Sequence, residues 1–145
     1  MKPTLGTPYP VDWDGAPIQM SPNDRDIWTY FQDQFAAEFL QLYFNVGVGV
    51  PTMWTPDLDE DMVRLVNEIS RRRIDVVGEK EDAWWLIELR INAGPGAIGS
   101  ILTYKTLWED DPPDARPVVP VIATNTQDAN LQRVCDRFGI TMIVV

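Results

Sequence analysis

The alternation of apolar and polar residues in the second half of the chain predicts strands and helices in turn. Four short apolar runs have the β-branched and aromatic content of strands, at residues 73–78, 83–91, 118–123 and 140–145. Three stretches have helical spacing, at residues 57–70, 97–108 and 128–138. The four polar residues at 79–82 suit a hairpin between the first two strands. This order predicts an α/β domain over residues 57–145, with a mixed sheet flanked by helices.

Capping residues indicate where two of these helices begin or end. Asp57 and Glu60 have the spacing of a capping box, and Met62, Val66 and Ile69 are expected to point inward from the helix that follows. Asn125 or Thr126 is expected to cap the helix over 128–138, and Gly139 to end it.

The first 56 residues divide into an arm and one amphipathic segment. Residues 1–20 are rich in proline and show no apolar period, which predicts an extended arm. Ser21 and Pro22 begin a helix whose apolar stripe runs to about Asn45, followed by a Gly/Val stretch that forms a loop or a short strand. We expect six large side chains of this region to contact another protein chain: Tyr9, Trp13, Ile18, Met20, Trp28 and Phe31.

Ordering about 20 arm residues costs tens of kcal/mol, and the few large side chains of the arm supply only about 1.5–3 kcal/mol each. We therefore expect the arm to need a partner chain and to be disordered in the isolated protein.

Composition narrows the possible chemistry. The chain of 145 residues has no histidine and one cysteine, Cys135, which excludes Ser-His and Cys-His catalysis, internal disulfides and zinc–thiolate clusters. Neither a signal peptide nor a membrane span is expected, and the cytoplasm or a virion is the expected location. The net charge of −10 is unusual for a free-standing nucleic-acid enzyme, because phosphate binding relies on basic residues.

Two carboxylates are expected to meet on the predicted hairpin. Alternate side chains of a strand share a face, so Glu88 and Arg90 point the same way and Asp75 can approach them from the preceding strand. Such a pair of carboxylates is suited to Mg²⁺, which prefers oxygen ligands. The alternative is an ion-pair network without a metal.

This pattern, with the order of elements around it, resembles the PD-(D/E)XK nuclease superfamily over about 90 residues. The resemblance implies a restriction-endonuclease-like core in which Asp75 and Glu88 bind a divalent cation. Arg90 stands where that family has lysine; arginine can hold a phosphate but stays protonated, so it cannot act as a base. Lys105 on the following helix, next to Tyr104, is where a displaced lysine is expected, and Glu68 is the acid expected on the preceding helix.

The lysine-to-arginine change and the acidic composition favour an inactive nuclease-like scaffold with a structural role and no cofactor. Small acidic chains of this organisation look like tailed-bacteriophage morphogenesis proteins, so a head–tail connector (neck) component is the expected function, by analogy. The alternatives are a Mg²⁺-dependent DNA endonuclease and an immunity-type partner whose acidic face mimics DNA. The Arg71–Arg73 cluster is expected to be a solvated strand edge rather than a phosphate site.

Overall fold

A computed structural model describes residues 1–145 apart from Ala16, Ile18, Trp54 and the side chain of Glu68. Its elements are α1 (Pro22–Phe35), the 3-10 turn η1 (Ala36–Glu38), β1 (Gln41–Val48), α2 (Glu60–Ser70), β2 (Arg72–Glu79), β3 (Trp84–Arg90), α3 (Pro95–Asp110), β4 (Val118–Thr124), α4 (Ala129–Arg137) and β5 (Thr141–Val144). No helix among the described residues is long and apolar enough to cross a membrane.

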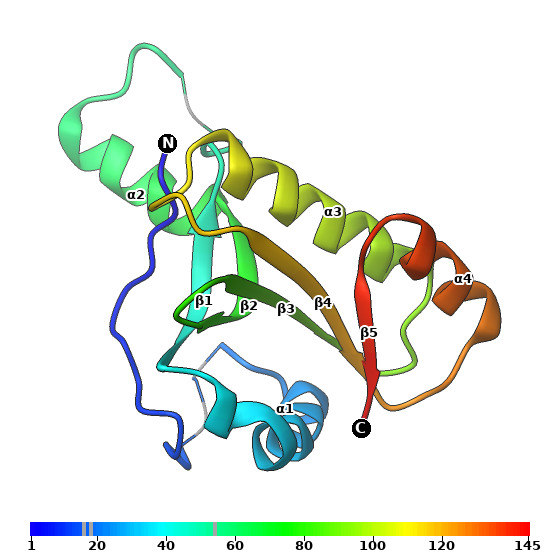
Figure 1. Ribbon diagram of the computed structural model, residues 1–145. Helices are drawn as coiled ribbons and strands as arrows, with labels where there is room; N and C mark the ends of the chain where they lie inside the picture. Colours follow the sequence, from blue (N-terminus) through cyan, green and yellow to red (C-terminus); the bar gives the residue numbers. More distant parts are fainter. Residues whose placement is uncertain (16, 18, 54) are drawn as a thin grey trace.

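The strands form one five-stranded mixed sheet in the order β1-β2-β3-β4-β5. The first three strands pair antiparallel and the last two join in parallel, each parallel connection being made by a helix. Figure 1 shows α3 and α4 on one side of this sheet and α1 on the other. The predicted mixed α/β fold with helices on its faces is confirmed, as are the four strands and the antiparallel hairpin between β2 and β3.

Two hydrophobic clusters fill the two sides of the sheet, and β3 contributes to both. Trp84 and Leu86 belong to the cluster beneath α3, while Ile87 and Leu89 belong to the cluster beneath α1. This division follows from the strand period of two, since successive side chains leave opposite faces. Glu88 and Arg90 share a face with Leu86, as predicted, and the structure places that face on the α3 side of the sheet.

The helix predicted to reach Asn45 ends ten residues earlier, at Phe35, and this prediction was wrong. A short 3-10 turn follows, and Gln41–Val48 then forms the edge strand β1, which pairs with β2. The predicted boundary at residues 56 and 57 therefore falls inside one fold, because β1 and β2 share a sheet. Phe39 packs over Gly78 of β2, where a Cβ atom would lie 2.4 Å from the Phe39 ring.

The N-terminal arm lies along the free edge of β1, on its own domain (Figure 1). Tyr9 exchanges two backbone hydrogen bonds with Leu42, and the Thr4 amide donates to Gly47 O. The buried Arg71 donates to Lys2 O and to the Thr4 hydroxyl, and also to Gly49 O. The arm thus pairs with the edge of its own sheet in this structure, while the expected contact with a partner chain stays a prediction. The unpaired edge of β1 supplies backbone hydrogen bonds that offset part of the cost of ordering the arm.

Two helix starts differ from the prediction by a few residues. The cap of α2 is Asp59, whose carboxylate accepts the Met62 amide, instead of Asp57. Asp128 caps α4 by accepting from two backbone amides, in place of Asn125 or Thr126. Gly139, at φ +67°, ends α4 as predicted, in the left-handed region that glycine adopts without strain.

Candidate functional site

Asp75 and Glu88 lie opposite each other where the pairing of β2 with β3 stops. The two strands pair from Glu79 and Trp84 as far as Val76 and Ile87, and the next positions are Asp75 and Glu88. There the Asp75 carboxylate (Oδ2) accepts the Leu89 amide at 2.9 Å, in place of a backbone acceptor. The strands separate at this point, so both carboxylates can turn toward each other.

The other neighbour of Asp75 is Asn45 of β1. The register places Phe44 against Val76 and Val46 against Ile74, so Asn45 lies opposite Asp75. Asn45 has a φ of 53°, a left-handed conformation that is uncommon for a residue other than glycine, although asparagine adopts it most readily. The sheet is thus irregular on both sides of Asp75.

The two carboxyl groups contact each other by a hydrogen bond and hold a proton more tightly than isolated acids do. Burial, then the charge and hydrogen bond of Asp75, raise the pKa of Glu88 to about 8. Burial is also the largest cause of the raised pKa of Asp75, which the Leu89 amide partly opposes. At neutral pH the Glu88 carboxyl group therefore keeps its proton beside Asp75.

One oxygen of Glu88 is left without a hydrogen-bond partner. Glu88 is 5% exposed, and its Oε2 accepts no hydrogen bond from any residue that the structure describes. A buried polar atom of this kind is costly unless it is satisfied by water or an ion. Such an atom in a carboxylate pair is what an oxygen-binding cation would satisfy.

Arg90 partly offsets the charge of the pair. Its guanidinium lies 3.6 Å from Glu88 Oε1 and donates a long 3.4 Å hydrogen bond to the Ser100 hydroxyl of α3. The Arg90 side chain is 41% exposed, whereas that of Glu88 is 7% exposed. The arginine therefore covers one side of the pair and keeps donors that can reach an anion in solvent.

Tyr104 and Asp24 complete the surroundings, and sequence reasoning did not place Asp24 there. Burial, then the charges of Glu88 and Asp75, raise the pKa of Tyr104 to about 12, so this phenol stays protonated at neutral pH. Asp24, in the first turn of α1, lies near enough to raise the pKa of Asp75 further. Asp24 is thus an acid on a preceding helix that lies near Asp75, while the side chain of Glu68, the acid expected from the sequence, lies outside the described part of the chain.

Lys105 forms an ion pair with Glu109, one turn further along α3. Tyr104, the residue before it, lies close enough to Glu88 and Asp75 for their charges to raise its pKa, and neighbouring residues on a helix point about 100° apart. The interpretation of Lys105 as a displaced catalytic lysine stays a prediction.

The described side chains that were expected to contact a partner chain pack against other residues of the same chain. Met20, Trp28 and Phe31 are buried in the core beneath α1, where a partner cannot reach them. Tyr9 and Trp13 are half-buried in an aromatic cluster with Phe44. The ring centroids of Tyr9 and Trp13 lie 4.3 Å apart. Ile18 lies outside the described residues.

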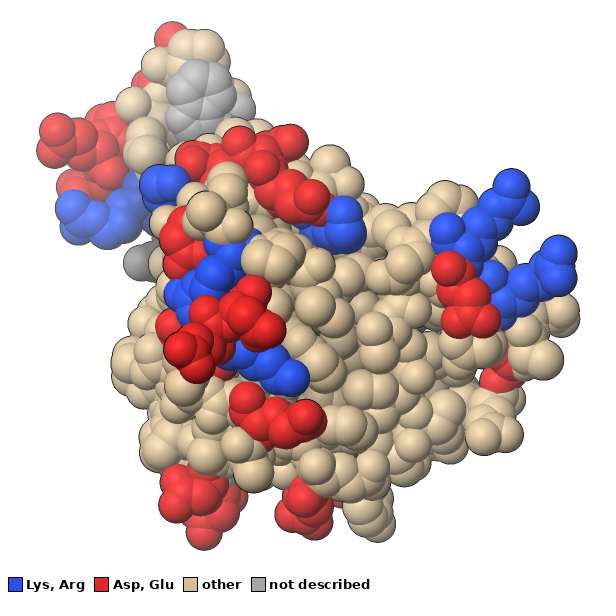
Figure 2. Space-filling view, in the orientation of Figure 1, with Lys and Arg blue, Asp and Glu red and all other residues tan. Residues whose placement is uncertain are grey.

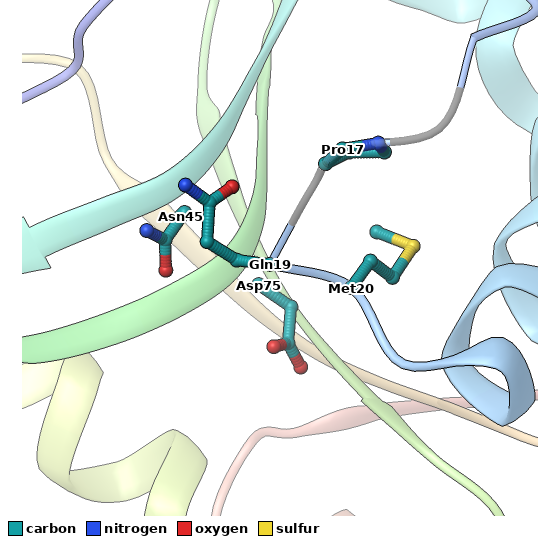
Figure 3. Close-up of a pocket in the computed structure, with 5 residues that line it drawn as sticks. All are labelled: Pro17, Gln19, Met20, Asn45 and Asp75. Carbon is teal, nitrogen blue, oxygen red and sulfur yellow. The ribbon is translucent and has the colours of Figure 1, made fainter.

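A small cavity adjoins Asp75 on the arm side. It is lined by Pro17, Gln19, Met20, Asn45 and Asp75 and holds about 20 Å³, roughly the room that one water needs. Figure 3 shows that the Asp75 carboxylate points away from the Gln19 amide, so the arm covers the backbone side of this residue and leaves its oxygens facing the site.

The donor set fits a hard divalent cation better than any other metal. Both acids offer oxygen, and Mg²⁺ is commonly bound by one or two carboxylates while it keeps several waters. No cluster of three or more acidic, histidine or cysteine side chains with metal-binding geometry occurs in the described part of the chain, so solvent would supply the remaining ligands.

The surface around the fold carries no continuous basic band on the face drawn in Figure 2. Lys and Arg lie there in separate groups, each beside Asp or Glu. Arg71 and Arg73 of the basic cluster are held by structural contacts with backbone carbonyls rather than displayed for phosphate.

Comparison with known proteins gives no match, since no family model, no curated protein and no solved structure matches the chain.

Proposed function

We propose that the chain is a divalent-cation-dependent phosphodiester hydrolase built on a restriction-endonuclease-like core. The observation that carries the proposal is the buried Asp75–Glu88 pair, which shares a proton and leaves one Glu88 oxygen without a partner. Strongly perturbed carboxylates that face each other are typical of functional sites. The order α1-β1-β2-β3-α3-β4, with the acids at the separation of β2 and β3, agrees with the sequence resemblance to PD-(D/E)XK nucleases.

Each residue of the site has a distinct role in this proposal. Asp75 and Glu88 hold the cation, and the cation lowers the pKa of a bound water and neutralises developing charge on phosphate. Arg90 takes the place of lysine as an electrostatic group: its exposed donors hold a phosphate oxygen, but it takes no proton. Tyr104, which stays protonated, can donate a hydrogen bond to the same oxygen.

Binding of the cation is expected to release a proton, because it replaces the one that the carboxyl pair shares. Calorimetric titration with Mg²⁺ or Mn²⁺ in buffers of different ionisation enthalpy measures that release directly. Between pH 6 and 7.5 the affinity should rise about tenfold for each pH unit. An affinity that does not change with pH would remove the carboxyl pair from the metal site.

Activity is tested on supercoiled and single-stranded DNA with Mn²⁺. Glu88→Gln and Asp75→Asn should each lower cleavage at least about a hundredfold, while Glu109→Gln, an exposed acid on α3, serves as the matched control. Arg90→Lys restores the residue of the resembled family and should retain or raise activity. Cleavage that survives both substitutions in the carboxyl pair would refute the proposal.

A structural role without catalysis is the second candidate, and one observation favours it. Arg90 already offsets the charge of Glu88, and the face shown in Figure 2 lacks the basic band by which nucleic-acid enzymes bind phosphate. In this alternative the chain is an inactive scaffold in a larger assembly, for instance a phage head–tail connector. This alternative predicts that adding a metal releases no proton. It also predicts that Glu88→Gln is more stable than wild type at alkaline pH and still assembles.

A further inference from the structure

Helix α2 and the loop before it expose a cluster of apolar side chains that the fold leaves uncovered. The members are 48–59% exposed: Met53, Met62, Leu65 and Ile69, here called the α2 patch. The Met53 amide donates to the Ser70 hydroxyl, which fixes the loop residue beside the C-terminal end of α2. Met62 and Ile69 were predicted to point inward, and the structure places them in solvent instead.

This helix receives little support from its own chain. Of the α2 side chains that the structure describes, only Val66 is buried. A helix of 11 residues is marginal in water by itself and is normally stabilised by packing of its apolar face. Figure 1 shows α2 at the margin of the molecule near the N-terminus, away from α1 and α4, so another protein can approach it.

The charges along α2 indicate which partner fits. Acidic residues gather at its start, with Asp57, Asp59, Glu60 and Asp61, while the exposed Arg72 follows its end. In Figure 2 the region over α2 shows separate groups of acidic and basic residues. Two copies packed antiparallel would place the acidic start of each helix beside the basic end of the other, and would oppose their helix dipoles favourably.

The apolar positions agree with the same arrangement. An antiparallel register that sets Met62 against Ile69 of a second copy also sets Leu65 near Leu65 of that copy, at the twofold axis. It also brings the acidic start of α2 beside the end of α2 in the second copy, where Arg72 begins β2. A patch whose apolar and charged residues complement those of a second copy is what an isologous dimer requires.

We propose that the α2 patch is the interface of a homodimer in which two α2 helices pack antiparallel about a twofold axis. The interface is small, so the association is weak and dependent on concentration. Each copy keeps its own carboxyl pair, and the dimer does not depend on the hydrolase activity proposed above.

Sedimentation equilibrium of the full chain over about a hundredfold range of concentration tests the dimer. Leu65→Glu places a charge at the twofold axis and should raise the dissociation constant at least about tenfold. Val134→Glu introduces the same charge at a partly exposed apolar position on α4 and should leave association unchanged. A wild-type chain that stays monomeric at every concentration, or a dimer that Leu65→Glu does not weaken, would overturn the proposal.

A charge exchange tests the orientation of the helices. Arg72→Glu alone should weaken self-association because two acidic ends then repel. The pair Asp57→Lys with Asp61→Lys should weaken it because the start of α2 loses its net negative charge. Mixing these two variants restores complementarity at one end of the interface. The mixture should therefore associate more tightly than the Arg72→Glu chain does alone. A mixture no tighter than that chain would refute the antiparallel arrangement, and circular dichroism of each variant verifies that the fold is intact.

Discussion

Replacing Glu88 by glutamine should make the protein less sensitive to alkaline pH. The pKa of Glu88 is about 8 in the folded protein and 4.5 as an ordinary glutamate. A folded-state pKa above the unfolded value means that the folded protein binds the proton more tightly. The stabilisation is therefore complete below pH 4.5 and is lost as pH rises to about 8.

The magnitude follows from the size of this interval. Each pH unit between the two pKa values changes the free energy of unfolding by about 1.4 kcal/mol, and the whole interval accounts for at most about 5 kcal/mol. Because the Glu88 side chain is 7% exposed, solvent screening reduces this value little, whereas sharing of the proton with Asp75 spreads it over both groups. Glutamine keeps the shape of the side chain and cannot ionise.

Urea unfolding of both proteins from pH 5 to pH 9 measures the effect. The free energy of unfolding of Glu88→Gln relative to wild type should rise steadily up to about pH 8 and then level off. Glu109→Gln, at an exposed ion pair on α3, should differ from wild type by no more than about 0.5 kcal/mol at any pH. Parallel curves for wild type and Glu88→Gln would show that Glu88 ionises normally, and the account of the carboxyl pair would be wrong.

Two further substitutions test the packing around the sheet. Gly78→Ala should lower the free energy of unfolding by about 1–3 kcal/mol in urea, because the new methyl group would overlap the Phe39 ring. Arg71→Met removes the hydrogen bonds to Gly49 O and Lys2 O, so we expect a loss of about 1.5–3 kcal/mol. That variant should also lose amide protection at Thr4; unchanged hydrogen exchange there would show that Arg71 does not hold the arm.

The four strands after residue 70 could be predicted because each is a short, nearly continuous apolar run, and the pairing of β2 with β3 because the turn between them is short. The run Trp84–Arg90 alternates between two cores, and this alternation is visible in the sequence. The edge strand β1 was missed because Phe35, Phe39 and Leu42 continue a helical spacing across the 3-10 turn that ends α1. The alternation of Leu42 with Phe44 and Val46 was the competing signal.

The site could be predicted only as far as it depends on neighbouring strands. Asp75 and Glu88 meet because hairpin register is local, so the sequence places them together. Asp24 is far from Asp75 and Glu88 in the sequence. Its position depends on how α1 packs on the sheet, and no local sequence pattern predicts that packing. Lys105 is harder to place from the sequence, because the direction of its side chain depends on the phase of α3, and the structure pairs it with Glu109.

The arginine at position 90 changes how the site handles protons. A lysine beside buried carboxylates can give up its proton, and so can share the protonation of the site with them. Arg90 stays charged, so the acids alone must take up and release the proton that the site shares. Release must then go to solvent, either as pH rises toward 8 or when a cation takes the place of the proton. In the proposed hydrolase, arginine at position 90 therefore leaves the carboxyl pair able to bind a cation. It makes the affinity for that cation depend on pH in a range where histidine-free proteins otherwise titrate little.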